Sequence, residues 1–206
     1  MTAQVVVIDY GMSNLASLAR SLEKCGASPL FSSDPKEILE ASKIILPGVG
    51  SFAEGMANLS KLGLVSPLRD IASGKTIPIL GICLGMQLLA STGSEGYEVE
   101  GLNLIPGKVI KLESHNDQDK IPHVGWNNIE IKQDDPILAE IPDNTDFYFV
   151  HSYYFQPTSE DTIIATTPHC GNFASVIRLN NIYGTQFHPE KSSQPGLKLL
   201  SNFLNL

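Results

Sequence analysis

Short apolar runs alternate with amphipathic stretches in the first half of the chain. The run 5–8 is apolar throughout, and Leu15, Leu18 and Leu22 then recur at helical spacing as far as Gly26. This pattern predicts a strand followed by a helix that buries one face.

Three more strands follow, with predicted helices between them. Leu30 and Phe31 begin a second strand, after which Asp34 suits the N-cap of a helix, Pro35 its first position and Glu37 the capping-box position. The other predicted elements are strands at 43–46 and 77–82, a helix with Ser51 and Glu54 as capping box, and a helix opened by Ser66 and Pro67. A β-α-β-α-β-α-β order predicts a parallel sheet covered on both faces.

The second half has shorter apolar runs separated by Asn, Asp, Gly and Pro. Its predicted strands lie at 109–112, 129–131, 147–150, 163–166, 174–179 and 182–187, and a last helix covers about 195–204. We find no repeat or linker. The expected fold is therefore one α/β domain over residues 1–206: an open, mixed, mainly parallel sheet with helices on both faces and an antiparallel extension.

Composition narrows the class of protein. The 206 residues are 42% hydrophobic and 17% charged, which is typical of a folded chain, and 14 Lys and Arg face 22 Asp and Glu for a net charge of -8. Such a surface repels a phosphate backbone, so we expect no nucleic-acid partner. The first ten residues lack a basic segment, and proline and glycines interrupt the uncharged stretch 76–94. We therefore expect a cytoplasmic protein without a membrane partner.

The chain has three cysteines, Cys25, Cys83 and Cys170, with no C-x-x-C spacing. This sparse, odd set argues against a disulfide framework and against a structural zinc site. We expect a reducing compartment, no metal and no cofactor.

One of these cysteines stands in a distinctive context. Cys83 lies between Gly81 and Gly85 where the fourth strand passes into a helix, which is the pattern of a nucleophile elbow. Glycines permit the sharp turn, and free N–H groups at the helix start favour a thiolate. The alternative is that Cys83 is a buried small hydrophobic residue.

A thiolate nucleophile needs a base, and His188 with Glu190 two residues later fits that need. In an extended segment the two side chains project to the same side, so Glu190 could orient the imidazole. The alternative is a surface histidine beside a solvated glutamate. The competing histidines are His115, His123, His151 and His169; of these only His115 has a carboxylate at i+2, Asp117, within the polar run 113–120.

Acyl chemistry also needs donors for a developing oxyanion. The N–H of Leu84 is one candidate, and Val49 in the glycine-rich turn 47–50 is the second. The turn is equally compatible with a purely structural role.

Taken together, the segments 81–87 and 187–190 resemble the Cys-His-Glu signature of triad-type (class I) glutamine amidotransferases. Further segments make the chain similar to the glutaminase subunits of imidazole glycerol phosphate synthase: 9–11 with Asn14, 46–50, 122–127, 147–153 and Lys191. The resemblance spans nearly the whole chain.

The resemblance implies that Cys83 attacks the side-chain amide of glutamine, while His188, oriented by Glu190, protonates the departing ammonia and later activates water. It implies that Gly50, Gln87, Glu95 and Ser152 hold the glutamine. Gln87 also lies one helical turn after Cys83 and so can share its face.

It further implies a heterodimer with a (β/α)8-barrel cyclase that receives the ammonia for histidine biosynthesis. The rim candidates for docking are Asn14, Tyr148 and Lys191. Glutaminases of this family commonly idle until the synthase binds its substrate, which is a hypothesis for this chain.

Three alternatives remain open at this stage. Residues 88–96 are less bulky and less acidic than in most histidine-pathway members, and similar paralogues resemble ammonia suppliers for amidination of an acetamido sugar. A stand-alone cysteine hydrolase is the second alternative, and it would need no partner. A non-catalytic subunit is the third, against which the intact Cys83, His188 and Glu190 argue.

Overall fold

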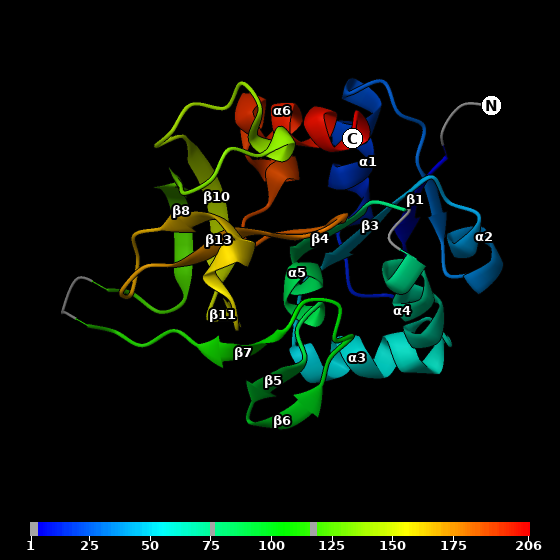
Figure 1. The fold of residues 1–206 in the computed structure, drawn as a ribbon, viewed down its shortest axis with the longest axis horizontal. Helices are drawn as coiled ribbons and strands as arrows, with labels where there is room; N and C mark the ends of the chain where they lie inside the picture. Colours follow the sequence, from blue (N-terminus) through cyan, green and yellow to red (C-terminus); the bar gives the residue numbers. More distant parts are fainter. Residues whose placement is uncertain (1–3, 75–76, 116–118) are drawn as a thin grey trace.

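The structure is a computed structural model that describes residues 4–74, 77–115 and 119–206 (Figure 1). Over these ranges an eight-stranded sheet forms the centre, in the order β2-β1-β3-β4-β14-β13-β12-β9. Its strands are β1 (Val5–Ile8), β2 (Leu30–Ser32), β3 (Lys43–Gly48), β4 (Ile79–Cys83), β9 (Glu130–Ile131), β12 (Ile163–Thr167), β13 (Phe173–Leu179) and β14 (Ile182–Thr185). From β2 to β14 neighbouring strands are parallel, and from β14 to β9 they are antiparallel.

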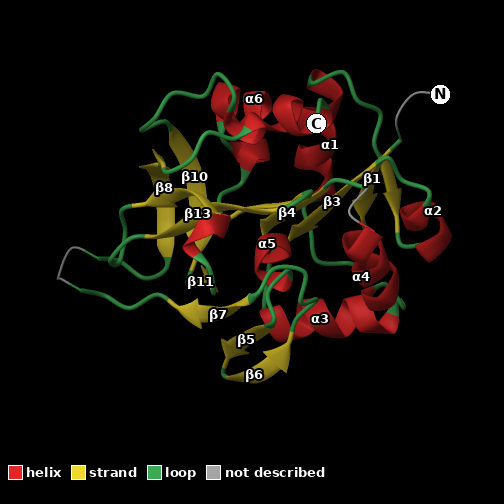
Figure 2. Ribbon diagram, in the orientation of Figure 1, coloured by secondary structure: helices red, strands yellow, loops and turns green. Residues whose placement is uncertain are grey.

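Helices cover both faces of this sheet (Figure 2). One layer contains α2 (Pro35–Leu39), α3 (Phe52–Lys61), α4 (Val65–Gly74) and α5 (Leu84–Leu88), and the other contains α1 (Leu15–Lys24) and α6 (Ser193–Leu204). Within β1, Val6 and Ile8 pack under the first layer while Val5 and Val7 pack under the second. A strand buried on both faces must be apolar at every position, which explains the unbroken run in the sequence.

Two smaller sheets extend the structure beyond the central one. A four-stranded sheet has the order β11-β7-β5-β6, and β8 pairs with β10. Their bounds are β5 (Thr92–Glu95), β6 (Tyr97–Glu100), β7 (Gly107–Lys111), β8 (His123–Asn128), β10 (Asp146–His151) and β11 (Tyr153–Pro157); the short 3₁₀ helices are η1 (Pro136–Leu138), η2 (Glu160–Thr162) and η3 (Pro189–Lys191).

The mixed α/β fold expected from the sequence is confirmed, with local differences. The β5–β6 hairpin, β8 and β11 are absent from the sequence prediction, and β14 ends at Thr185 instead of at residue 187. Asp34 caps α2 as expected, but Glu37 does not close a capping box. Its carboxylate instead accepts from the Ser32 hydroxyl, whose oxygen accepts the N–H of Asp34.

Within the described ranges, the helices are all too short or too polar to span a membrane. The predicted carboxylate at Asp117 lies outside the described residues, so the pairing considered for His115 is not described either.

Candidate active site

Cys83 occupies a strained turn between β4 and α5. Its backbone has φ +54° and ψ −110°, a conformation that residues other than glycine rarely adopt. A Cβ added at Gly85 would overlap the carbonyl oxygen of Leu46, and one added at Gly81 would lie 2.7 Å from the carbonyl oxygen of Gly85. The two glycines therefore let β3, β4 and α5 touch through their backbones, which lifts the sulfur out of the sheet edge.

The turn also positions a hydrogen-bond donor beside the sulfur. Leu84 is the first residue of α5, and the N–H groups of a first helical turn have no acceptor within the helix. The Leu84 amide thus has the position expected of an oxyanion donor.

His188 and Glu190 lie together after the end of β14. The imidazole Nδ1 is 2.8 Å from the Glu190 Oε1, and the side chains are only 2% and 7% exposed. The sequence prediction of an extended segment here is wrong, because η3 begins at Pro189; a 3₁₀ turn, not a strand, brings the two groups together.

The electrostatics of His188 favour its charged form. Burial lowers its pKa, but the nearby Cys83 sulfur and the bonded Glu190 carboxylate outweigh this effect and raise the pKa to about 10. Glu190 engages Nδ1, so the other ring nitrogen, Nε2, which meets no nitrogen or oxygen partner among the described residues, is the one available to move a proton.

The neighbouring histidines His123 and His151 differ from His188 in their protonation state. His151 Nδ1 is 2.9 Å from the Tyr153 carbonyl, and its Nε2 is 3.1 Å from His123 Nδ1. A carbonyl only accepts, so Nδ1 of His151 carries a hydrogen; in the neutral ring its Nε2 then accepts a hydrogen bond from Nδ1 of His123. Burial lowers the pKa of His123 to about 4 and that of His151 to about 3, helped by the adjacent imidazoles. Neither is therefore poised to take a proton as His188 is.

A buried hydrogen-bond network that connects Gln87 and Gln186 to the Cys83 sulfur was missed by sequence reasoning. Gln87 Nε2 donates to the Tyr153 carbonyl at 2.8 Å and to the Gln186 Oε1 at 3.1 Å. The amide nitrogen of Gln186 then faces Cys83, with Nε2 3.7 Å from Sγ. The available signal was the amide side chain of Gln186 next to Thr185 within the predicted strand 182–187, two positions before His188.

A cavity of about 400 Å³ opens beside Cys83 and collects most of the predicted site residues. Its lining includes Val49, Gly50, Cys83, Leu84, Gln87, Glu95, Ser152 and Lys191. Glu95 accepts the N–H of Phe52, the first residue of α3, at 2.8 Å through Oε2, so Oε1 is the oxygen left for a ligand. A larger hollow of about 640 Å³ lies beside Arg69, but the described residues that line it include no cysteine or histidine.

The second predicted oxyanion donor points elsewhere. The N–H of Val49 donates to the Met12 carbonyl at 2.7 Å, in the loop after β1. In this conformation the amide cannot also donate to an oxyanion at Cys83, which differs from the expectation for Val49.

The predicted docking residues lie near exposed apolar side chains. Lys191 is exposed, and its Nζ lies 5.9 Å from the ring centre of Tyr148, which in turn meets Trp126 edge-on at 6.1 Å. Trp126 is 53% exposed and Val124 57%. Asn14 is exposed at the start of α1 without a side-chain capping bond.

Comparison with known families gives one match over almost the whole chain. Residues 6–206 match the family described as "Glutamine amidotransferase class-I". A relative from Moorella thermoacetica, named imidazole glycerol phosphate synthase subunit HisH, is 47% identical over 199 residues, covering 97% of this chain and 93% of the relative. Relatives of the same name include one from Geobacter sulfurreducens, 46% identical over 97% of both chains. A Campylobacter jejuni protein called subunit HisH 1 is 45% identical over 98% of this chain and 100% of its own.

Solved structures agree on the fold. A structure described as a glutamine amidotransferase superposes with a TM-score of 0.76 at 15% identity, covering 98% of this chain and 99% of the other. The structure of PurLQS from Thermotoga maritima gives a TM-score of 0.75 at 18% identity, covering 100% and 99%. At such low identities these likenesses concern the fold alone.

Proposed function

The chain belongs to the class I glutamine amidotransferase family, and from this premise we propose that it hydrolyses glutamine and supplies the ammonia to the cyclase subunit of imidazole glycerol phosphate synthase in histidine biosynthesis. The observations that carry the chemistry are the strained turn of Cys83, which lies close enough to His188 to raise its pKa, and the buried His188–Glu190 pair. The assignment to histidine biosynthesis is supported by the names of the relatives and by alignments that cover nearly the whole of both chains.

The first half of the reaction forms a thioester. The Cys83 thiolate attacks the side-chain carbonyl carbon of glutamine, and the C–N bond breaks as His188 Nε2 gives its proton to the leaving nitrogen, which departs as ammonia. A raised pKa keeps that proton on His188 at neutral pH. Glu190 holds Nδ1 and stabilises the imidazolium.

The second half hydrolyses the thioester. His188, now neutral, takes a proton from water, the hydroxide adds to the carbonyl carbon, and the C–S bond breaks to release glutamate and restore the thiolate. Each tetrahedral state places negative charge near the Leu84 amide.

We propose that the second donor becomes available only after a backbone change. The Val49 N–H is engaged by Met12 at 2.7 Å, so the resting state has one oxyanion donor fewer than the chemistry can use. One such donor contributes about 3 kcal/mol to the transition state, a factor of roughly 10² in rate. Rotation of the peptide that precedes Val49 would free it, which makes slow turnover in the absence of the partner the expected behaviour.

The cavity offers hydrogen-bond acceptors to the α-ammonium end of glutamine. Glu95 Oε1 would accept from the ammonium, and the carbonyl oxygen of Gln87 is its second acceptor because both amide hydrogens are engaged. Gly50 and Ser152 border the same space and would contact the rest of the substrate.

The relatives are named as subunits, and we infer that this chain too is one subunit of a complex. The partner is proposed to be a (β/α)8-barrel cyclase, docked on the rim that carries Tyr148, Lys191, the exposed Trp126 and Asn14. We further propose that residues 1–206 act as one glutaminase domain and that the complex works in the cytoplasm. The sugar-amidating alternative is not favoured, since the similar proteins named above carry the histidine-pathway name.

The test is release of glutamate from glutamine by the purified chain, alone and with the cyclase subunit and its ribonucleotide substrate. We expect slow turnover alone and strong stimulation by the loaded cyclase. Cys83→Ala should remove the activity and leave binding to the cyclase intact. Partner-independent turnover would favour the cysteine hydrolase, and full activity in Cys83→Ala would refute the nucleophile.

A further inference from the structure

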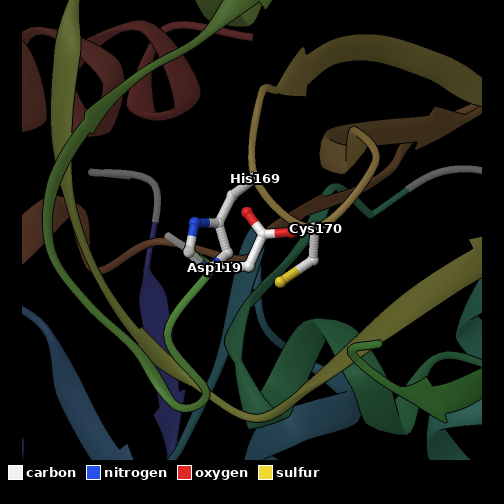
Figure 3. A group of neighbouring side chains, drawn as sticks. All are labelled: Asp119, His169 and Cys170. Atoms are coloured by element: carbon white, nitrogen blue, oxygen red, sulfur yellow. The ribbon is translucent and has the colours of Figure 1, made fainter. Parts of the chain in front are cut away.

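A second group of potential ligands lies outside the catalytic pocket. Figure 3 shows the side chains of Asp119, His169 and Cys170 converging from two segments of the chain. Asp119 belongs to the connection between β7 and β8, whereas His169 and Cys170 form part of the turn between β12 and β13. Their donor atoms all lie within 4.8 Å of one another.

This donor set suits a borderline divalent cation. Zinc binds thiolate, imidazole and carboxylate at about 2.0–2.3 Å, so its tetrahedral ligands stand roughly 3.3–3.8 Å apart. The observed separations, at most 4.8 Å, come within about 1 Å of that arrangement, a gap that small side-chain rotations can close. A sulfur ligand disfavours magnesium and calcium, which prefer oxygen.

We propose that Asp119, His169 and Cys170 bind one zinc ion, with a fourth position open to water or another side chain. No zinc site is expected from the sequence, because the cysteine spacing lacks a C-x-x-C pair. The three ligands come instead from segments about 50 residues apart, one of which contributes adjacent His and Cys residues.

Backbone groups hold two of the ligands in a suitable state. His169 Nε2 is 3.1 Å from the Lys120 carbonyl, which only accepts, so a neutral ring has its lone pair on Nδ1. Asp119 Oδ2 accepts the backbone N–H of His115 at 2.8 Å, which fixes the carboxylate. Such outer contacts are typical of metal ligands.

A fourth side chain lies close by. A Cβ at Gly171 would be 2.7 Å from His115 Nε2, so the His115 ring rests against the residue that follows Cys170. His115 is therefore a candidate for the fourth position. A bound ion would cross-link the β7–β8 connection to the β12–β13 turn.

The experiment uses the full chain and Co²⁺ as a spectroscopic substitute for zinc. We expect one equivalent of Co²⁺ to bind with a thiolate-to-cobalt charge-transfer band, and one equivalent of Zn²⁺ to remove that band. Cys83 and His188 could also bind cobalt, so the titration is repeated on Cys83→Ala, in which we expect the same band. A band lost in Cys83→Ala, or no cobalt uptake by the natural chain, would overturn the proposal.

Ligand variants complete the test. Cys170→Ala should abolish the charge-transfer band, while the matched variant Cys25→Ala, at the other free cysteine outside the pocket, should keep it. Asp119→Asn preserves the shape of a partly exposed side chain and should weaken cobalt binding by at least about tenfold. Persistence of the band in Cys170→Ala, or unchanged affinity in Asp119→Asn, would refute the assignment.

Discussion

Replacement of Glu190 by Gln tests the orienting role of the carboxylate most directly. Both side chains of the His188–Glu190 pair are buried, and the Nδ1–Oε1 distance is 2.8 Å, so solvent screens the interaction little. With charge centres about 4 Å apart and an effective dielectric constant of about 20, the attraction between imidazolium and carboxylate is about 4 kcal/mol. Glutamine keeps the size but removes the charge.

Without the carboxylate, the imidazolium–thiolate pair that attacks glutamine becomes less favourable than the neutral imidazole and thiol, so the loss falls on the population of the reactive state. About 4 kcal/mol corresponds to roughly a 10³-fold fall in kcat. The amide introduced by Glu190→Gln could also donate to Nδ1 and force the proton onto Nε2, which adds to the loss. Because Glu190 does not line the substrate cavity, KM should change less than about threefold.

The assay is initial-rate glutamate release at saturating and limiting glutamine, with the loaded cyclase present. The matched control is Glu160→Gln, at an exposed glutamate of η2, which should leave both constants unchanged. The pKa of His188 should fall in Glu190→Gln, since its carboxylate is one of the groups that raise it. A kcat within tenfold of the natural chain, with the loss appearing in KM, would refute the orienting role.

Three further predictions concern neighbouring features. Gln186→Met removes the donor that faces the sulfur and should slow alkylation of Cys83 by iodoacetamide about tenfold at neutral pH; an unchanged rate would exclude this contact with the thiolate. Gly85→Ala forces a methyl group into the carbonyl oxygen of Leu46 and should lower the free energy of unfolding by about 3 kcal/mol or more in urea; near-natural stability would contradict the packing. His123 and His151 have pKa values lowered to about 4 and about 3 in the folded protein, so on acidification the unfolded chain binds protons at these residues at a higher pH than the folded one. The free energy of unfolding should therefore fall as the pH drops from about 6.5 toward 4. The fall should be smaller in His123→Gln, which lacks one of the two groups.

The parallel centre of the sheet could be predicted because β1 is apolar at every position and β3 carries the apolar run 44–46. β1 and β3 are buried on both faces, and their sequences show it without reference to partners. The hairpin of β5 and β6 has no such pattern. It forms through tertiary contacts such as that of Gly93, where a Cβ would lie 2.6 Å from the ring of Phe52.

The residues of the site likewise fall into those that a short sequence motif predicts and those that only the fold brings together. Cys83 between its glycines and His188 with Glu190 are signals contained within a few residues. Gln186 meets Gln87 across 99 positions of the chain, and only the fold brings the two amides together. The engagement of the Val49 amide by Met12 is a choice of backbone orientation, which residue types do not specify.

The contact of Gly85 with Leu46 has a consequence for how this protein can change over time. The nucleophile is located by main chain resting on main chain, and main chain is the same at every residue. Exchanges of one aliphatic side chain for another in either layer of the core can therefore accumulate without displacing the sulfur. At residue 85, by contrast, there is no gradual route, because no amino acid is intermediate in size between glycine and alanine. We expect the molecule to tolerate wide substitution in its interior and almost none at this one point, whatever partner it serves.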